Sequence, residues 1–138
     1  TGRAVRGGTG FMYINPDHWY LFCRFELEAG QALVIRLDPP ECHWWGLYGY
    51  DRYAQPFPYV GEAHNLVSIG NAVPGDDGSV TIVVSAEDVG APNWIDTGGR
   101  TDGTLVIRWT ITGIDPSENP DVPVPSTRVV PTSSLLPG

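Results

Sequence analysis

The chain has 138 residues and a formal net charge of −8, with eight Arg, no Lys and sixteen acidic side chains. This length suffices for one domain with its own hydrophobic core, and so acidic a chain is a poor partner for nucleic acid or an anionic membrane surface. No run of eighteen apolar residues is present that could span a bilayer. No leader peptide is recognisable in this sequence, and it assigns no compartment.

In chain order, residues 1–17 are rich in Gly and Arg, and we expect a linker there with a short first strand at 11–14. Alternating apolar residues and the turn signals between them predict strands at 18–27, 32–37, 42–52, 66–69, 79–85 and 104–112. No segment has apolar residues that recur every three to four positions, as in an amphipathic helix. The 113–138 segment is proline-rich and, apart from 127–130, cannot be a central strand, so we expect an extended tail that packs on the domain or on a partner.

This pattern predicts an all-β fold. We expect an antiparallel β-sandwich, jelly-roll-like, with its core in residues 18–112 and the extended proline-rich tail at the C-terminus. Two cysteines are present, Cys23 and Cys42. Cys23 shares a strand face with large apolar residues, which favours a buried free thiol, although a disulfide between the two stays open.

The predicted strand at 42–52 is rich in aromatic residues and carries bulky side chains on both faces. One face has Trp45 and Leu47, and the other has Trp44, Tyr48 and Tyr50. We expect one face to pack into the core and the other to meet a cover, a partner or a ligand. Sugar rings and flat apolar molecules bind to such aromatic faces, while carboxylates, amides and Arg fix their orientation. The alternative is that these rings pack against a neighbouring subunit or domain.

A rigid turn at 92–100, Pro-Asn-Trp-Ile-Asp-Thr-Gly-Gly-Arg, leads into the strongest alternating strand. As a structured loop it would present the amide of Asn93, the ring of Trp94 and the carboxylate of Asp96 to a ligand. A purely architectural role is the alternative, with Asn93 capping backbone groups and Asp96 forming an Asx turn. Arg108 faces outward on the next strand, and we expect it to pair with Asp51 or Asp96.

Metal-binding and nucleophilic patterns are weak. The possible metal ligands are His18, His43, His64, Glu41, Asp51 and Glu62. No two histidines are spaced as ligands on one strand or helix face, so we expect no metal site and no cofactor. A second acidic group consists of Asp76, Asp77, Glu87 and Asp88. Such acids ordinarily make turns rather than calcium sites. No Gly-x-Ser-x-Gly elbow surrounds any serine.

Several sequence blocks occur in a familiar order. They are Ala-Leu-Val-Ile-Arg at 32–36, Asp-Pro-Pro-Glu at 38–41, the aromatic segment 44–53, Asp-Gly-Ser at 77–79, Pro-Asn-Trp-Ile-Asp-Thr at 92–97, Gly-Thr-Leu at 103–105 and Thr-Arg-Val-Val at 127–130. From about residue 20 to 130 the chain resembles a bacterial β-domain family, domain of unknown function 1214. The resemblance implies a compact antiparallel β-sandwich at the C-terminal end of a longer protein, and it carries over no catalytic residues. The chain departs from it at 64–68, His-Asn-Leu-Val-Ser, where relatives have a basic residue and Ser-Leu-Asn, so a pocket lined by this segment would take a different ligand.

The sequence therefore favours a non-catalytic binding or assembly module. Its expected recognition residues are Trp44, Trp45, Tyr48, Tyr50, Asp51, Arg52, His64, Asn65, Asn93, Trp94, Asp96 and Arg108. Expected partners are a second copy, a second domain or subunit, or a small carbohydrate-like or aromatic ligand. The alternative is a hydrolase- or lyase-type enzyme that uses Asp51, Asp96, Arg108 and a histidine. Convergence of these groups in one pocket would favour the enzyme.

Overall fold

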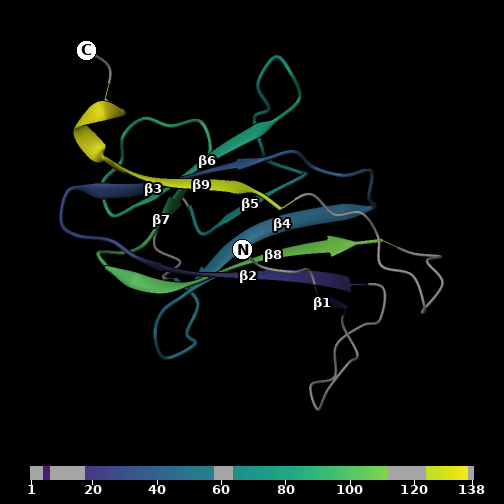
Figure 1. Cartoon of the computed structure of the whole chain (residues 1–138), viewed down its shortest axis with the longest axis horizontal. Coiled ribbons are helices and arrows are strands. Elements are labelled where there is room, and N and C mark those ends of the chain that lie inside the picture. Colours follow the sequence, from purple (N-terminus) through teal and green to yellow (C-terminus); the bar gives the residue numbers. More distant parts are fainter. Residues whose placement is uncertain (1–4, 7–17, 58–63, 112–123, 137–138) are drawn as a thin grey trace.

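The computed structural model describes residues 5–6, 18–57, 64–111 and 124–136, and Figure 1 shows them as two layers of β-strands. The elements in chain order are β1 (Val5–Arg6), β2 (His18–Glu26), β3 (Gln31–Leu37), β4 (Trp44–Tyr50), β5 (Leu66–Ser68), β6 (Val80–Ser85), β7 (Trp94–Asp96), β8 (Asp102–Thr110), β9 (Ser126–Pro131) and the 3₁₀ turn η1 (Thr132–Ser134). The all-β prediction is confirmed. Among these elements, no helix is long or apolar enough to cross a bilayer.

The strands form two sheets. One has the order β1-β2-β8-β4-β5 and the other the order β7-β6-β3-β9. Neighbouring strands run antiparallel except β6 and β7, which pair in parallel. Because strands of both sheets contribute to one buried cluster, the molecule is a two-layer, sandwich-like β fold.

The core lies between the sheets, where alternate side chains of each strand point inward. In the first sheet Trp19 of β2 stands opposite Trp109 of β8, and the two are 1% and 0% exposed. In the second sheet, Ile35 of β3 and Ile82 of β6 stand opposite each other and are likewise buried. Each fully buried side chain of this size contributes about 1.5–3 kcal/mol of hydrophobic free energy, so these paired positions hold the layers together.

The second sheet is also covered on its outer face. Ala32 and Val34 of β3 and Val83 of β6 are buried there with Val89 from the loop after β6. The chain end helps to close this side, since Thr132 of η1 donates its backbone N–H to the Gly30 carbonyl. Part of β3 and β6 is therefore buried on both faces, although the edge strand β9 stays exposed, whereas the outer face of the first sheet carries the large exposed ring of Phe22.

One expected loop contains a strand. Trp94–Asp96 forms β7 along the edge of β6, because Ile95 is fully buried and backbone groups on both sides of it bond to β6. Three residues are too few for alternation to reveal a strand. At the other edge, β9 comes from the proline-rich segment and pairs with β3.

Some expectations lie outside the described residues. They concern the strand at 11–14, the rest of the 1–17 segment apart from β1, the last residue of the strand at 104–112, and residues 113–123 and 137–138 of the tail. Cys23 and Cys42 are both free and pack partly buried against the core. Burial raises the pKa of the Cys42 thiol, partly offset by a backbone hydrogen bond at Trp44.

Candidate functional site

The outer face of the first sheet is built by the register of its three middle strands, β2, β8 and β4. Phe22 aligns with Val106 and Tyr48 in one row across these strands, because each is paired with its neighbour in the ladder. The next row runs from Arg24 through Thr104 to Tyr50. Residues two apart on a strand point to the same side, so both rows face away from the core.

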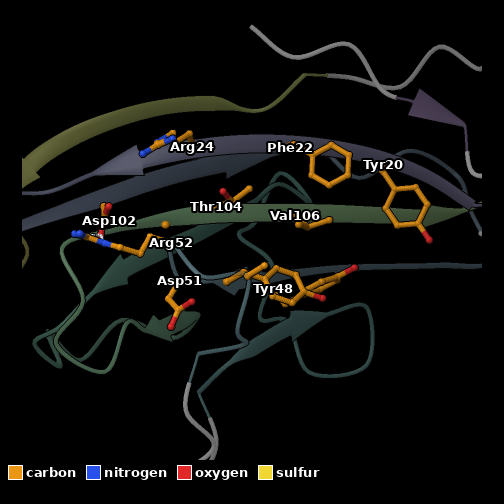
Figure 2. Close-up of a pocket in the computed structure, with 12 residues that line it drawn as sticks. Tyr20, Phe22, Arg24, Tyr48, Asp51, Arg52, Asp102, Thr104 and Val106 are labelled. Atoms are coloured by element: carbon orange, nitrogen blue, oxygen red, sulfur yellow. Dashed lines mark hydrogen bonds and ion pairs between the residues drawn. The ribbon is translucent and has the colours of Figure 1, made fainter. Parts of the chain in front are cut away.

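These rows line a groove of about 610 Å³. Its apolar part consists of Tyr20, Phe22, Tyr48, Tyr50 and Val106, and its polar part includes Arg24, Asp51, Arg52, Asp102 and Thr104. Figure 2 shows Tyr20, Phe22 and Tyr48 toward one end and Arg24, Arg52 and Asp102 toward the other. The groove is therefore aromatic at one end and charged at the other.

The rings of the aromatic end contact one another in pairs. Tyr20 and Phe22 stack with a centroid separation of 6.1 Å and an interplanar angle of 13°. Tyr48 and Tyr50 meet edge to face at 5.6 Å. Phe22 is still 54% exposed, which is unusual for a ring of that size on a regular strand. The ring pairs leave flat apolar surface open to the groove.

The carboxylates of the charged end are already engaged. Asp102 accepts hydrogen bonds from Nη2 and Nε of Arg52 at 3.0 and 3.3 Å. Asp51 accepts the backbone N–H groups of Tyr53 and Gln55 through Oδ1, and Oδ2 lies 3.4 Å from Nε of Arg100. The bond from Gln55 is the main cause that lowers the pKa of Asp51, with smaller contributions from Tyr53 and Arg100. Asp51 is thus a stable anion at neutral pH, and Asp102 is held in place by Arg52.

Tyr48 stays protonated in this setting. Burial is the main cause that raises the pKa of its phenol, and Tyr50 adds to the shift, while Arg108 opposes it. A neutral phenol can donate one hydrogen bond and present its ring face. Tyr48 is therefore suited to contact a ligand rather than to act as a base.

A second hollow of about 410 Å³ lies on the other side of Tyr48 and Tyr50. Trp44, Asn65 and Arg108 are among its lining residues. We expected Arg108 to pair with Asp51 or Asp96, but it forms no ion pair with a described residue. Its guanidinium lies over the Trp44 ring instead, with the guanidinium carbon 4.7 Å from the ring centroid. The cause is Gly46, which stands opposite Arg108 in the ladder and leaves space that the Trp44 ring fills.

The residues of the 92–100 segment that the sequence offered for binding make contacts within the fold, as the architectural alternative predicted. Asn93 is 3% exposed and holds backbone groups of Val73 and Thr81 through its side chain. Asp96 makes an Asx turn by accepting the Gly98 N–H at 2.7 Å. Trp94 donates its indole N–H to Ser85 and packs its ring at 4.9 Å from that of His64.

Of the other expected residues, Trp45 points into the core and is 3% exposed, so it offers nothing to a ligand. The groups named for an enzyme do not meet, because Asp51 lines the groove, Arg108 lines the second hollow and Asp96 lies on β7 in the other sheet. The sequence prediction also missed Tyr20, Phe22, Arg24 and Asp102. The sequence did contain a signal for Tyr20, Phe22 and Arg24, because alternation along β2 puts all three on its outward face.

Within the part of the chain that the structure describes, no three His, Cys, Asp or Glu side chains gather as a metal-binding group. Glu62 lies outside that part. Asp77 accepts the N–H and hydroxyl of Ser79 and pairs with Arg36, and Asp88 accepts the N–H of Gly90. These acids make turns, as the sequence suggested.

Fold and groove together define a small all-β module with an aromatic surface on one sheet. No family model matches the chain, and no curated protein is recognisably similar. Among solved structures, an uncharacterised protein from Burkholderia cenocepacia is similar over 87% of this chain at 32% identity, with a TM-score of 0.73. The VPA0106 protein from Vibrio parahaemolyticus is similar over 80% at 16% identity, with a TM-score of 0.58, which shows the fold alone. This chain spans only 31% and 30% of those chains.

Proposed function

We propose that the chain is a non-catalytic binding module whose groove holds a small ligand with flat apolar faces, such as a sugar ring or an aromatic ring. The single observation that carries this proposal is the aromatic lining of a concave sheet face, with the Phe22 ring left 54% exposed. A volume of about 610 Å³ falls in the range of small-molecule sites. Large exposed apolar patches on soluble domains commonly mark interaction sites.

Binding is favoured over the hydrolase- or lyase-type alternative by the state of the groove's titratable groups. A general acid or base works best with a pKa near the operating pH. The pKa of Asp51 is lowered and that of Tyr48 is raised, so both shifts move away from neutrality. Asp102 is held by Arg52. These groups are arranged to orient a ligand rather than to exchange protons with it.

The wider setting is also a proposal. We infer a jelly-roll-like sandwich, related to the bacterial domain of unknown function 1214 and part of a larger protein or complex. In support, the chain passes back and forth between the sheets, from β2 to β3 to β4 and again from β6 and β7 to β8 and β9. The similar Burkholderia cenocepacia chain is about three times as long as the region that it shares with this one. The edge pairing of β9 supports a proline-rich tail that runs extended along the domain.

Titration of ¹⁵N-labelled protein with two neutral probes, cellobiose and 2-naphthol, tests the binding proposal. We expect amide shifts to concentrate on the groove strands β2, β8 and β4. Phe22→Ala and Tyr48→Ala should each weaken binding by about fivefold to tenfold, because aromatic stacking contributes about 1 kcal/mol. Tyr53→Ala is the matched control, since this ring is 76% exposed and lines neither hollow.

Two outcomes would contradict the proposal. Shifts scattered over the second sheet would place any binding elsewhere. A concentration-dependent dimer that protects the groove strands from hydrogen exchange would assign the aromatic face to a second copy of the chain, another partner that the sequence allows.

A further inference from the structure

The charges around the groove are unequally compensated. Arg52 is paired with Asp102, and Asp51 is paired with Arg100. The side chain of Arg24 is exposed, lines the groove, and has no ion pair or hydrogen bond with any described residue. Once these pairs are counted, the groove retains one uncompensated positive charge. That charge stands out in a chain whose net charge is −8.

Arg24 lies next to the aromatic residues of the groove. It follows Phe22 on the same outward face of β2, and its row continues through Thr104 to Tyr50. Neighbouring outward residues of one strand lie about 7 Å apart, a gap that a six-membered ring with an attached carboxylate can bridge to a long Arg side chain. Figure 2 shows Arg24 at the charged end, beyond Phe22.

We propose that the ligand of the groove is a ring compound bearing a single carboxylate, which Arg24 binds while the ring lies on Phe22 and Tyr48. The inference rests on the proposed function and names the ligand class for the same groove. A guanidinium binds a carboxylate through two parallel hydrogen bonds, which also fixes the orientation of the ring. Both an acidic sugar and an aromatic acid have this chemistry.

The surroundings favour a monoanion over a phosphate or a polyanion. Asp102 and Asp51 already engage Arg52 and Arg100, so a second negative charge on the ligand would find no other unpaired cation among the described residues of the groove. The overall charge of −8 likewise gives no long-range attraction for anions. Selection of a carboxylate therefore depends on the local contact with Arg24.

The test uses probe pairs that differ in the carboxylate, 2-naphthoate against 2-naphthamide and digalacturonate against neutral galactobiose, titrated into ¹⁵N-labelled protein. We expect the acid of at least one pair to bind about tenfold more tightly than its neutral partner, because a charge-assisted hydrogen bond is stronger than a neutral one. The pair that shows the preference identifies the source, sugar acid or aromatic acid. Raising the salt concentration should reduce the preference.

Arg24→Gln should remove the preference for the acid, measured as the ratio of the two dissociation constants within a probe pair. Arg24→Lys keeps the charge without the planar fork and should retain part of the preference. Arg128→Gln is the matched control, because Arg128 is an exposed arginine on β9 in the other sheet. Unchanged amide dispersion in each variant would show that the fold is intact.

The outcomes separate this inference from the proposed function. Equal binding of acid and neutral probes in the groove would overturn the role of Arg24 but leave the groove as a binding site. A preference for the acid that persists in Arg24→Gln would also overturn it. If none of the four probes shifts the groove strands, the proposed function fails and the inference fails with it.

Discussion

The strongest prediction of stability concerns Asn93, because its side chain is buried and fully engaged. Its Nδ2 donates to the carbonyls of Val73 and Thr81 at 2.8 and 3.0 Å, and its Oδ1 accepts the Val73 N–H at 2.7 Å. The side chain thus ties the segment after β5 to the strands β6 and β7. Asn93→Ala would remove all three hydrogen bonds and leave three backbone groups without these partners.

The magnitude follows from the count of bonds. Each hydrogen bond of this kind contributes about 1 kcal/mol net, within a range of about 0.5–1.5, so we expect Asn93→Ala to lower the free energy of unfolding by about 3 kcal/mol. Typical domains have only about 5–15 kcal/mol in total. The same loss corresponds to a fall in Tm of about 10 °C for a chain of this length.

Urea denaturation followed by tryptophan fluorescence measures this loss, with the m-value expected to stay unchanged. Asn71→Ala is the matched control, since Asn71 also bonds two backbone groups, those of Ser68 and Leu66, but is exposed. We expect the control to cost less than about 1 kcal/mol, because water replaces the lost partners. If Asn93→Ala costs no more than Asn71→Ala, the structural role assigned to Asn93 is refuted.

Two further predictions concern acid stability and packing. The pKa of Asp51 is lowered in the fold, so the stability that its carboxylate contributes is present above the unfolded pKa of about 3.9 and is lost as pH falls through the lowered value. In urea titrations between about pH 5 and pH 2, Asp51→Asn should therefore lose less stability than the wild-type protein. Parallel curves of stability against pH for the two proteins would contradict this. Gly49→Ala should cost about 1–3 kcal/mol in thermal or urea unfolding, because its Cβ would overlap the buried ring of Phe57. Gly70→Ala is its control, since a Cβ there meets only the Ser68 Oγ, at 3.7 Å, and equal losses in both variants would count against the packing argument.

The local pattern of the sequence was sufficient for most strands and their buried faces. The inward positions Leu105, Ile107 and Trp109 of β8 follow from alternation alone, because successive side chains of a strand point to opposite faces. The same rule places Trp44 and Tyr48 of β4 outward. It failed at β7, where a parallel edge strand of three residues shows no periodicity.

The groove depended on contacts that no local pattern contains. Phe22 and Tyr48 lie in one row only because β8 is inserted between β2 and β4, and strand order is decided by pairing across long sequence separations. The partner of Arg108 was likewise set by Gly46 on a neighbouring strand, which makes room for the Trp44 ring. Alternation along the chain determined which side chains face outward, whereas the order and register of the sheet decided which of them meet, because side chains on different strands become neighbours only when the strands pair.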